Sequence, residues 1–96
     1  PYTTLFRSGA ALDLVPIAKL QNLGAASARW LGEAGIHARG DLVRVGPVLA
    51  YKLVKQREPK ANLSLLWCLV AALEDRSCLE VTEATKARLL RELERL

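Results

Sequence analysis

The chain has 96 residues, which suits one domain and is short for two. It is 51% hydrophobic but only 5% aromatic, so its core must consist mainly of Leu, Ala and Val. The formal net charge is +4, and no apolar run approaches the roughly 20 residues of a membrane-spanning helix. Composition therefore argues against a membrane protein, and the helical spacing of the Leu and Ala residues predicts an all-α domain.

The first residues differ in character from the rest. Pro1-Tyr-Thr-Thr-Leu-Phe-Arg-Ser8 resembles the in-frame translation of a common sequencing adapter. No segment of charged and then apolar residues marks a signal peptide. We expect residues 1–15 to be artefactual or disordered, the natural start of the protein to be missing, and residues 16–96 to form the helical domain.

A first pair of helices is predicted over residues 16–20 and 25–34. Pro16 can open a helix because its missing N–H costs nothing there, and Asn22 tolerates the left-handed conformation that ends one. Gly24 is expected to let the backbone turn tightly into the second helix. We expect Ala28, Trp30 and Leu31 to face inward, and the small residues Ala25 and Ala26 to let the helices approach closely.

The same pattern recurs 22 residues later, with helices predicted over residues 39–43 and 47–56. The residues that coincide are Leu20 and Leu42, Gly24 and Gly46, Ala28 and Ala50, and Leu31 and Leu53. Gly46-Pro47 is a strong helix start, since Gly is permissive at the cap and Pro suits the first helical position. We expect the second helix to bury Val48 or Leu49, Ala50, Leu53 and Val54, with Lys52 and Lys55 in solvent.

Two further helices are predicted, over residues 63–73 and from Thr82 to the C-terminus. The first follows the N-cap residue Asn62 and is apolar almost all round, which places it at the centre of the fold. In the intervening loop Leu79 is a candidate anchor, and the inward residues of the last helix should be Leu89, Leu90, Leu93 and Leu96. The sequence thus predicts a small bundle of five to six helices containing two tandem helix-hairpin-helix-like units.

The basic residues are concentrated in the repeated region. From Lys19 to Lys60 there are eight basic residues against three acidic ones, a local balance of +5. The second helix of such a hairpin begins with free backbone N–H groups that suit a phosphate oxygen. The residues that could contact nucleic acid are Asn22, Gly24, Ala25, Ser27, Arg29, Arg44, Gly46, Lys52 and Lys55. The other interpretation is a solvated basic face on a hairpin used for packing.

The hairpin turn of helix-hairpin-helix proteins has the pattern Leu-x-Gly-hydrophobic-Gly. Both copies here keep only the second glycine, and the first is replaced by Asn22 and by Arg44. Arg adopts a positive φ much less readily than Gly, so the first hairpin is the better candidate for phosphate contact.

Nothing in the sequence indicates catalysis, a metal or a cofactor. Cys68 and Cys78 are ten residues apart without a C-x-x-C motif, and His37 is the only histidine, so no metal site is expected. Ser27 has no visible base and acid partners for a triad. We expect a non-enzymatic protein with reduced thiols in the cytoplasm, and Trp30 and Trp67 in the core rather than serving as stacking platforms.

Taken in order, several of these residues resemble the C-terminal domain of the TfoX/Sxy competence regulators. The resemblance covers residues 18–93 and includes Asn22-Leu-Gly24-x-x-Ser27-Ala-x-Trp30-Leu31, Gly35-Ile36, Asp41-Leu42, Gly46, Ala50-Tyr51 and the run from Asn62 to Leu73. It implies an all-α domain of the helix-hairpin-helix or SAM-like type. It also implies a link to natural transformation genes, where such proteins act with a cyclic-AMP-responsive transcription activator. Many members carry an additional N-terminal α/β domain.

Two functions therefore remain open at the level of sequence. The first is a regulatory module in transcription with weak, backbone-directed association with DNA. The second is a docking domain that contacts a transcription activator or a missing N-terminal domain without touching DNA.

Overall fold

The computed structural model describes residues 14–96, which form an all-α bundle, and so confirms the predicted fold class. The predictions for residues 1–13 lie outside the described residues. The elements are two 3₁₀ turns and five α-helices: η1 (Ile17–Lys19), α2 (Ala25–Glu33), α3 (Arg39–Val45), α4 (Pro47–Arg57), α5 (Leu63–Leu73), η2 (Cys78–Glu80) and α6 (Glu83–Arg95). Between residues 14 and 96 there is no strand, only an antiparallel bridge between Pro16 and Ala38.

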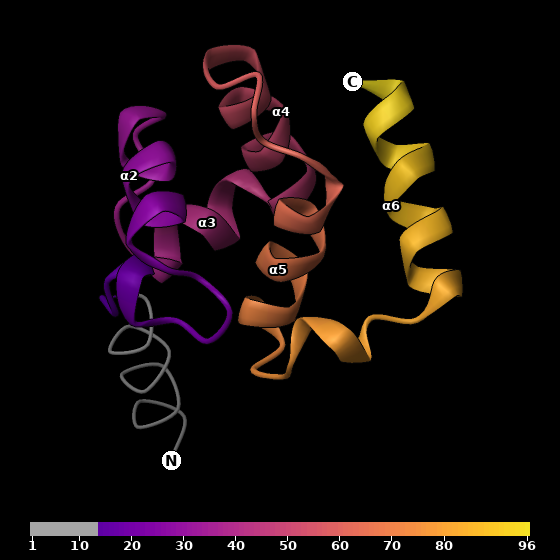
Figure 1. Cartoon of the computed structure of the whole chain (residues 1–96), viewed down its shortest axis with the longest axis horizontal. Coiled ribbons are helices and arrows are strands. Elements are labelled where there is room, and N and C mark those ends of the chain that lie inside the picture. The colour runs from indigo at the N-terminus through magenta and orange to yellow at the C-terminus, as the bar shows by residue number, and fades with distance from the viewer. Residues whose placement is uncertain (1–13) are drawn as a thin grey trace.

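Helix α5 is the central element, with α2 and α3 on one side of it and α6 on the other (Figure 1). It begins where predicted, because the Asn62 side chain accepts a hydrogen bond from the Ser64 N–H at 3.0 Å. Six of its eleven residues are buried, which its nearly continuous apolar sequence requires: Leu65, Leu66, Leu69, Val70, Ala71 and Ala72. Each large side chain buried in this way contributes about 1.5–3 kcal/mol to folding.

The core is built by every α-helix, but unequally. The largest fully buried side chains come from η1, the α2–α3 connection and the helices from α2 to α5: Ile17, Leu31, Ile36, Leu42, Val54, Leu66 and Leu69. Helix α6 contributes only Leu89 as a buried residue, with Leu93 partly buried beside it. Helix α6 is therefore attached to the rest of the bundle through a narrow apolar strip.

All the predicted helix ends agree with the structure to within two residues, but the first element is a 3₁₀ turn and not an α-helix. That helix is reduced to the 3₁₀ turn η1, because Asn22, at φ 73°, reverses the chain immediately afterwards. The turn is secured by main-chain bonds from Ile17 N–H to the His37 carbonyl and from Arg39 N–H to the Val15 carbonyl, at 3.1 and 2.8 Å. These bonds join segments distant in sequence, so local patterns did not predict them.

The two hairpins share a sequence pattern but differ in their backbone turns. In the first, the positive φ is at Asn22, whereas Gly24 is extended at φ −99°. In the second, the equivalent of Asn22 is Arg44, which is helical, and the positive φ of 88° is at Gly46. The prediction that Gly24 provides a tight turn is therefore wrong, since any residue can adopt its conformation.

Several predicted inward positions are also wrong. Leu79 is 92% exposed and anchors nothing, and Leu90 and Leu96 are 37% and 50% exposed. For Leu90 and Leu96 the reason is that α6 packs on one side, against α4, and fully buries only Leu89. Of the alternatives on α4, Val48 is buried and Leu49 is exposed, and Leu53 is only partly buried. Ala25 and Ala26 face solvent and mediate no close helix approach.

Tyr51 on α4 is also buried, a position that the apolar spacing of that helix did not predict. Both tryptophans lie partly buried against the core, as predicted. The Lys86 ammonium lies 5.6 Å from the centroid of the Trp67 ring, within cation–π range.

Candidate nucleic-acid interface

The turn of the first hairpin is held by the side chain of Asn22. Its Nδ2 group donates to the Arg76 carbonyl at 2.6 Å, and its Oδ1 atom accepts from the Cys78 N–H at 3.1 Å. Both ends of the amide therefore bind the α5–α6 connection. Asn22 was predicted as a phosphate contact, and the structure gives its side chain a different, tertiary role. Its positive φ agrees with the sequence prediction.

Helix α2 begins with unpaired backbone donors. The first hydrogen bond of the helix runs from Ala28 N–H to the Gly24 carbonyl, and Gly24 offers no side-chain cap. Within the described residues the N–H groups of Ala25, Ala26 and Ser27 consequently have no acceptor. Ala25 and Ala26 are exposed, so this end of the helix is open to an anion.

The start of α4, in the second hairpin, offers fewer donors. Its first residue is Pro47, which has no N–H, and its first hydrogen bond runs from Ala50 N–H to the Gly46 carbonyl. Arg44, two residues before Gly46 in the sequence, is ion-paired with Asp41 on the same helix. The structure thus favours the first hairpin over the second as an anion-binding site, for reasons of backbone chemistry.

Asp41 holds the start of α3 together. Its Oδ2 atom accepts from the N–H groups of His37 and Ala38, at 3.1 and 3.2 Å. These bonds, followed by the Arg44 guanidinium, hold the pKa of the Asp41 carboxyl below its usual value of 3.8. The carboxylate stays charged and offsets the positive charge of Arg44, which weakens Arg44 as a phosphate ligand.

The two nominated lysines of α4 bind main-chain oxygens. The Lys52 ammonium donates to the oxygen of Leu96 at 2.6 Å and thereby links α4 to the end of α6. Lys55 donates to the carbonyls of Pro59 and Ala61, at 2.8 and 2.5 Å, and closes the α4–α5 connection. Lys55 is exposed, as expected for the solvent side of α4, and Lys52 is partly buried, but neither ammonium group is without an internal acceptor.

Arg57 is engaged in the same way, through a bond to the Glu33 carbonyl at 2.6 Å. Of the nominated basic residues, Arg29 alone has no hydrogen-bond or ion-pair partner in the described part of the chain. The ammonium groups of Lys19 and Lys60, which were not among the predicted contacts, are also without a partner there. The sequence could not distinguish Lys19 and Lys60 from the other basic residues, because the distinction depends on which main-chain carbonyls lie within reach of each side chain in the fold.

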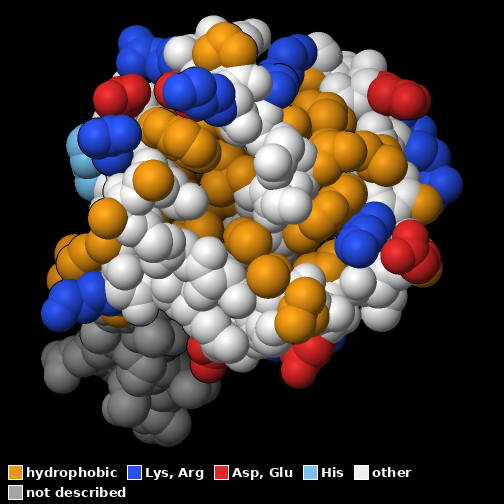
Figure 2. All heavy atoms as spheres, in the orientation of Figure 1, with side chains coloured by type: hydrophobic (Ala, Val, Ile, Leu, Met, Phe, Trp, Pro, Cys, Tyr) orange, Lys and Arg blue, Asp and Glu red, His pale blue; other side chains and the backbone are white. Residues whose placement is uncertain are grey.

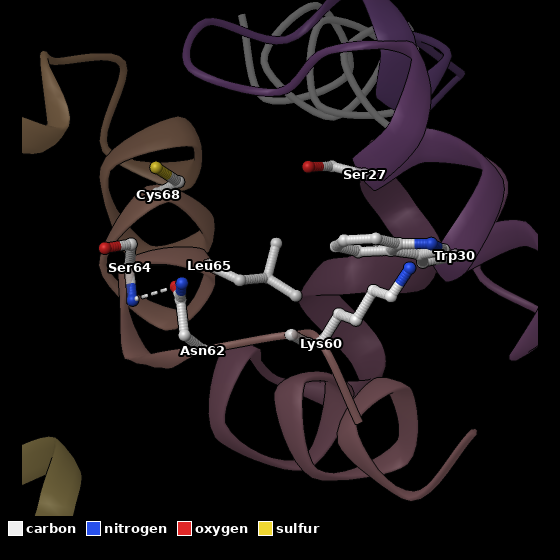
Figure 3. Close-up of a pocket in the computed structure, with 8 residues that line it drawn as sticks. Ser27, Trp30, Lys60, Asn62, Ser64, Leu65 and Cys68 are labelled. Atoms are coloured by element: carbon white, nitrogen blue, oxygen red, sulfur yellow. Dashed lines mark hydrogen bonds between the residues drawn. The ribbon is translucent and has the colours of Figure 1, made fainter. Parts of the chain in front are cut away.

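A cavity of about 210 Å³ lies between α2 and the start of α5. It is lined by Ser27, Trp30, Lys60, Ala61, Asn62, Ser64, Leu65 and Cys68 (Figure 3). Ser27 is the one nominated residue in this lining, and sequence reasoning missed the others because they come from three separate segments. The candidate interface therefore comprises the start of α2, Arg29 and this neighbouring cavity.

The family model of the TfoX C-terminal domain matches residues 15–93. The chain belongs to this family. The match includes all five α-helices up to Leu93, and so the whole candidate interface lies within the TfoX C-terminal domain.

A solved structure supports the fold of this TfoX C-terminal domain. The crystal structure of an uncharacterized protein from Listeria monocytogenes, in a triclinic form, is similar with a TM-score of 0.76. The two sequences are 23% identical, and the similarity covers 84% of this chain and 92% of that one. At this identity the likeness concerns the fold alone. No curated protein matches the sequence at a significant level.

The domain's thiols are free, and its described residues hold no cluster of metal-ligating groups. Burial, and then the neighbouring thiol of Cys78, raise the pKa of Cys68 to about 11, so the Cys68 thiol is protonated and unreactive near neutral pH. No helix within residues 14–96 is long and apolar enough to cross a membrane.

Proposed function

We propose that this TfoX C-terminal domain is a non-catalytic regulatory module that associates weakly with the DNA backbone through its first hairpin. The observation that carries the proposal is the set of unpaired donors at the start of α2, with Arg29 on the same helix. Three adjacent N–H groups and a guanidinium suit phosphate oxygens and read no base sequence. Membership of the family supports the regulatory role.

Fluorescence anisotropy on a labelled duplex, across a salt series, tests this proposal. The logarithm of the binding constant should fall with the logarithm of salt concentration, with a slope of about −0.9 for each phosphate contacted. Arg29→Ala should weaken binding and reduce the magnitude of that slope by about 0.9, the contribution of one phosphate contact. Arg91→Ala on α6 is the matched control, because Arg91 is also an exposed helical arginine without a partner in the described chain.

Gly24→Ala provides an independent check. A methyl group at Gly24 meets no atom within 4 Å in the folded chain, and φ is −99°. The substitution should therefore leave stability unchanged, but it places a methyl group where a phosphate approaches the amides of α2. We expect weaker DNA binding at unchanged stability. Absence of binding by the unmodified chain, even at low salt, would refute the proposal.

The second candidate function is docking to a protein partner, such as the cyclic-AMP-responsive activator or an N-terminal domain. It is favoured by an apolar cavity of about 280 Å³ between the start of α4 and the end of α6. Leu49 and Leu96 line this cavity and are 39% and 50% exposed. Hydrophobic side chains gather on the face over α5 and α6 as well (Figure 2).

Leu49→Glu tests docking at this surface without altering the carbonyl contacts of Lys52 and Lys55. This variant should abolish capture of the purified activator while leaving DNA binding unchanged. Equal capture by the variant and the unmodified chain would contradict docking at this surface.

A further inference from the structure

The cavity beside α2 is formed by three segments that converge from different directions (Figure 3). Ser27 and Trp30 lie one turn apart on α2, and Leu65 extends toward them from the first turn of α5, where Ser64 and Cys68 also line the cavity (Figure 3). Lys60 and Asn62 belong to the α4–α5 connection, and the Lys60 side chain extends toward Trp30 in the close-up. A group in the cavity can thus be contacted from several sides.

The polar groups of this lining are mostly donors. The Ser27 and Ser64 hydroxyls, the Trp30 indole N–H and the Lys60 ammonium have no acceptor among residues 14–96. None of the eight lining residues is acidic. The carboxylate of Glu58 accepts from the Lys60 backbone N–H at 3.2 Å but lies outside the lining. A small space with a cation and several free donors suits an oxyanion.

The size of the cavity limits what it can hold. Pockets for small-molecule ligands usually measure roughly 300–1,000 Å³, whereas this one measures about 210 Å³. The cavity accommodates a single charged group better than a whole cofactor. The Ser27 hydroxyl and the Lys60 ammonium lie on different segments of the lining and can donate to one phosphate group.

The position of the cavity connects it with the first hairpin. Ser27 lines the cavity and is also the third residue of α2, so its unpaired N–H belongs to the open helix start. Arg29 follows two residues later on the same helix. We propose that this cavity, with Lys60 as its charged ligand, holds a phosphate group of a DNA strand bound at the first hairpin. This inference rests on the proposed function.

The two indole N–H resonances of the chain offer a test in ¹H–¹⁵N NMR spectra. Trp30 lines the cavity, whereas Trp67 does not and serves as the internal control. A hexathymidylate with a 5′-phosphate should shift the Trp30 resonance saturably and leave Trp67 unchanged. Inorganic phosphate should cause the same shift at higher concentration. The oligonucleotide without a terminal phosphate distinguishes the source, because it shifts Trp30 only when an internal phosphate enters the cavity.

Lys60→Ala should weaken binding of the phosphorylated oligonucleotide about tenfold, as the loss of a charge-assisted contact does. For this variant the slope of log binding constant against log salt concentration should be smaller in magnitude by about 0.7, the value for one phosphate of a single strand. Lys19→Ala is the matched control, since Lys19 is exposed, has no partner in the described chain and lies outside the cavity. Thermal unfolding of both variants would show that the fold is retained. Equal binding by Lys60→Ala and Lys19→Ala would overturn the proposal.

The remaining outcomes separate this site from the proposed function. Duplex binding that depends on Arg29 but not on Lys60 would support the proposed function and contradict a role for the cavity in it. A Trp30 shift with inorganic phosphate, abolished in Lys60→Ala, would support the phosphate site even if duplex binding failed. A shift caused by an acidic peptide, but by neither phosphate nor oligonucleotide, would overturn the proposal in favour of a protein ligand.

Discussion

Single side chains in this domain often serve the fold where charge and position had suggested binding. Asn22 combines a positive φ with two hydrogen bonds to the α5–α6 connection, and so it fixes the first turn against a segment more than 50 residues away. Lys52 and Lys55 satisfy main-chain oxygens. A basic residue close to a helix end is therefore a weak indicator of nucleic-acid contact unless its internal acceptors are known.

Asp41 gives a residue-scale prediction that depends on pH. Its folded pKa lies below the ordinary value of 3.8, since the His37 and Ala38 N–H groups bind the ionised form. A lowered carboxyl pKa stabilises the fold above that ordinary value, and the contribution is lost as pH falls through the folded pKa. In urea titrations from about pH 5 down to pH 3, Asp41→Asn should show a smaller decline in unfolding free energy than the unmodified chain.

A direct measurement accompanies this comparison. The NMR titration midpoint of the Asp41 carboxyl should lie below 3.8. A midpoint at or above that value would show that the backbone bonds do not form in solution. An equal loss of stability with falling pH in both chains would also contradict those bonds.

At the scale of the elements, periodicity and capping residues predicted most of the helices. Helix α5 follows from Asn62 and an apolar run, and α6 from the Thr82 side chain, which accepts from the Thr85 N–H. The wrong predictions concern which side chains of a helix are buried. Whether Leu89 or Leu90 faces inward depends on the angle at which α6 crosses α4, and no local pattern encodes that angle. The cavity was missed for the same reason, as it arises only when α2 and α5 meet.

The aligned glycines of the two hairpins provide the prediction for this scale. Gly46, at φ 88°, joins the end of α3 to the start of α4, so Gly46→Ala should lower the unfolding free energy by about 1–2 kcal/mol. Gly24→Ala should have no effect, because Gly24 is extended and a Cβ there meets no atom within 4 Å. Urea denaturation of the two variants measures the difference. Equal losses of unfolding free energy in the two variants would contradict the different backbone conformations of Gly24 and Gly46.

For the whole molecule, the central position of α5 explains why so small a domain can maintain a core without disulfides. Helix α4 packs against it, and α2 and α3 lie on one side of it and α6 on the other (Figure 1). The α5–α6 connection is joined to the first hairpin through Asn22. The start of α2 lies on the side of α5 away from α6 (Figure 1). The cavity beside it is lined by residues of α2, the α4–α5 connection and the start of α5, and by none of α6. We therefore expect that α6 can detach without unfolding the candidate interface.

That arrangement predicts uneven stability across the molecule. Helix α6 is attached through Leu89, which is 3% exposed, and the partly buried Leu93, whereas α5 is buried on most of its surface. Amide hydrogen exchange should thus be faster in α6 than in α5. Leu89→Ala should accelerate exchange throughout α6 and destabilise its docking by about 2–5 kcal/mol, the usual cost of truncating a buried leucine.

Leu90→Ala is the matched control, because Leu90 is adjacent in sequence but 37% exposed, and its truncation should change exchange little. If Leu89→Ala accelerated exchange equally in α5 and α6, the domain would unfold as one unit. The candidate interface would then unfold together with α6. Retained exchange protection in α2 and α5 of the Leu89→Ala variant would instead show that the first hairpin and its cavity stay folded when α6 detaches.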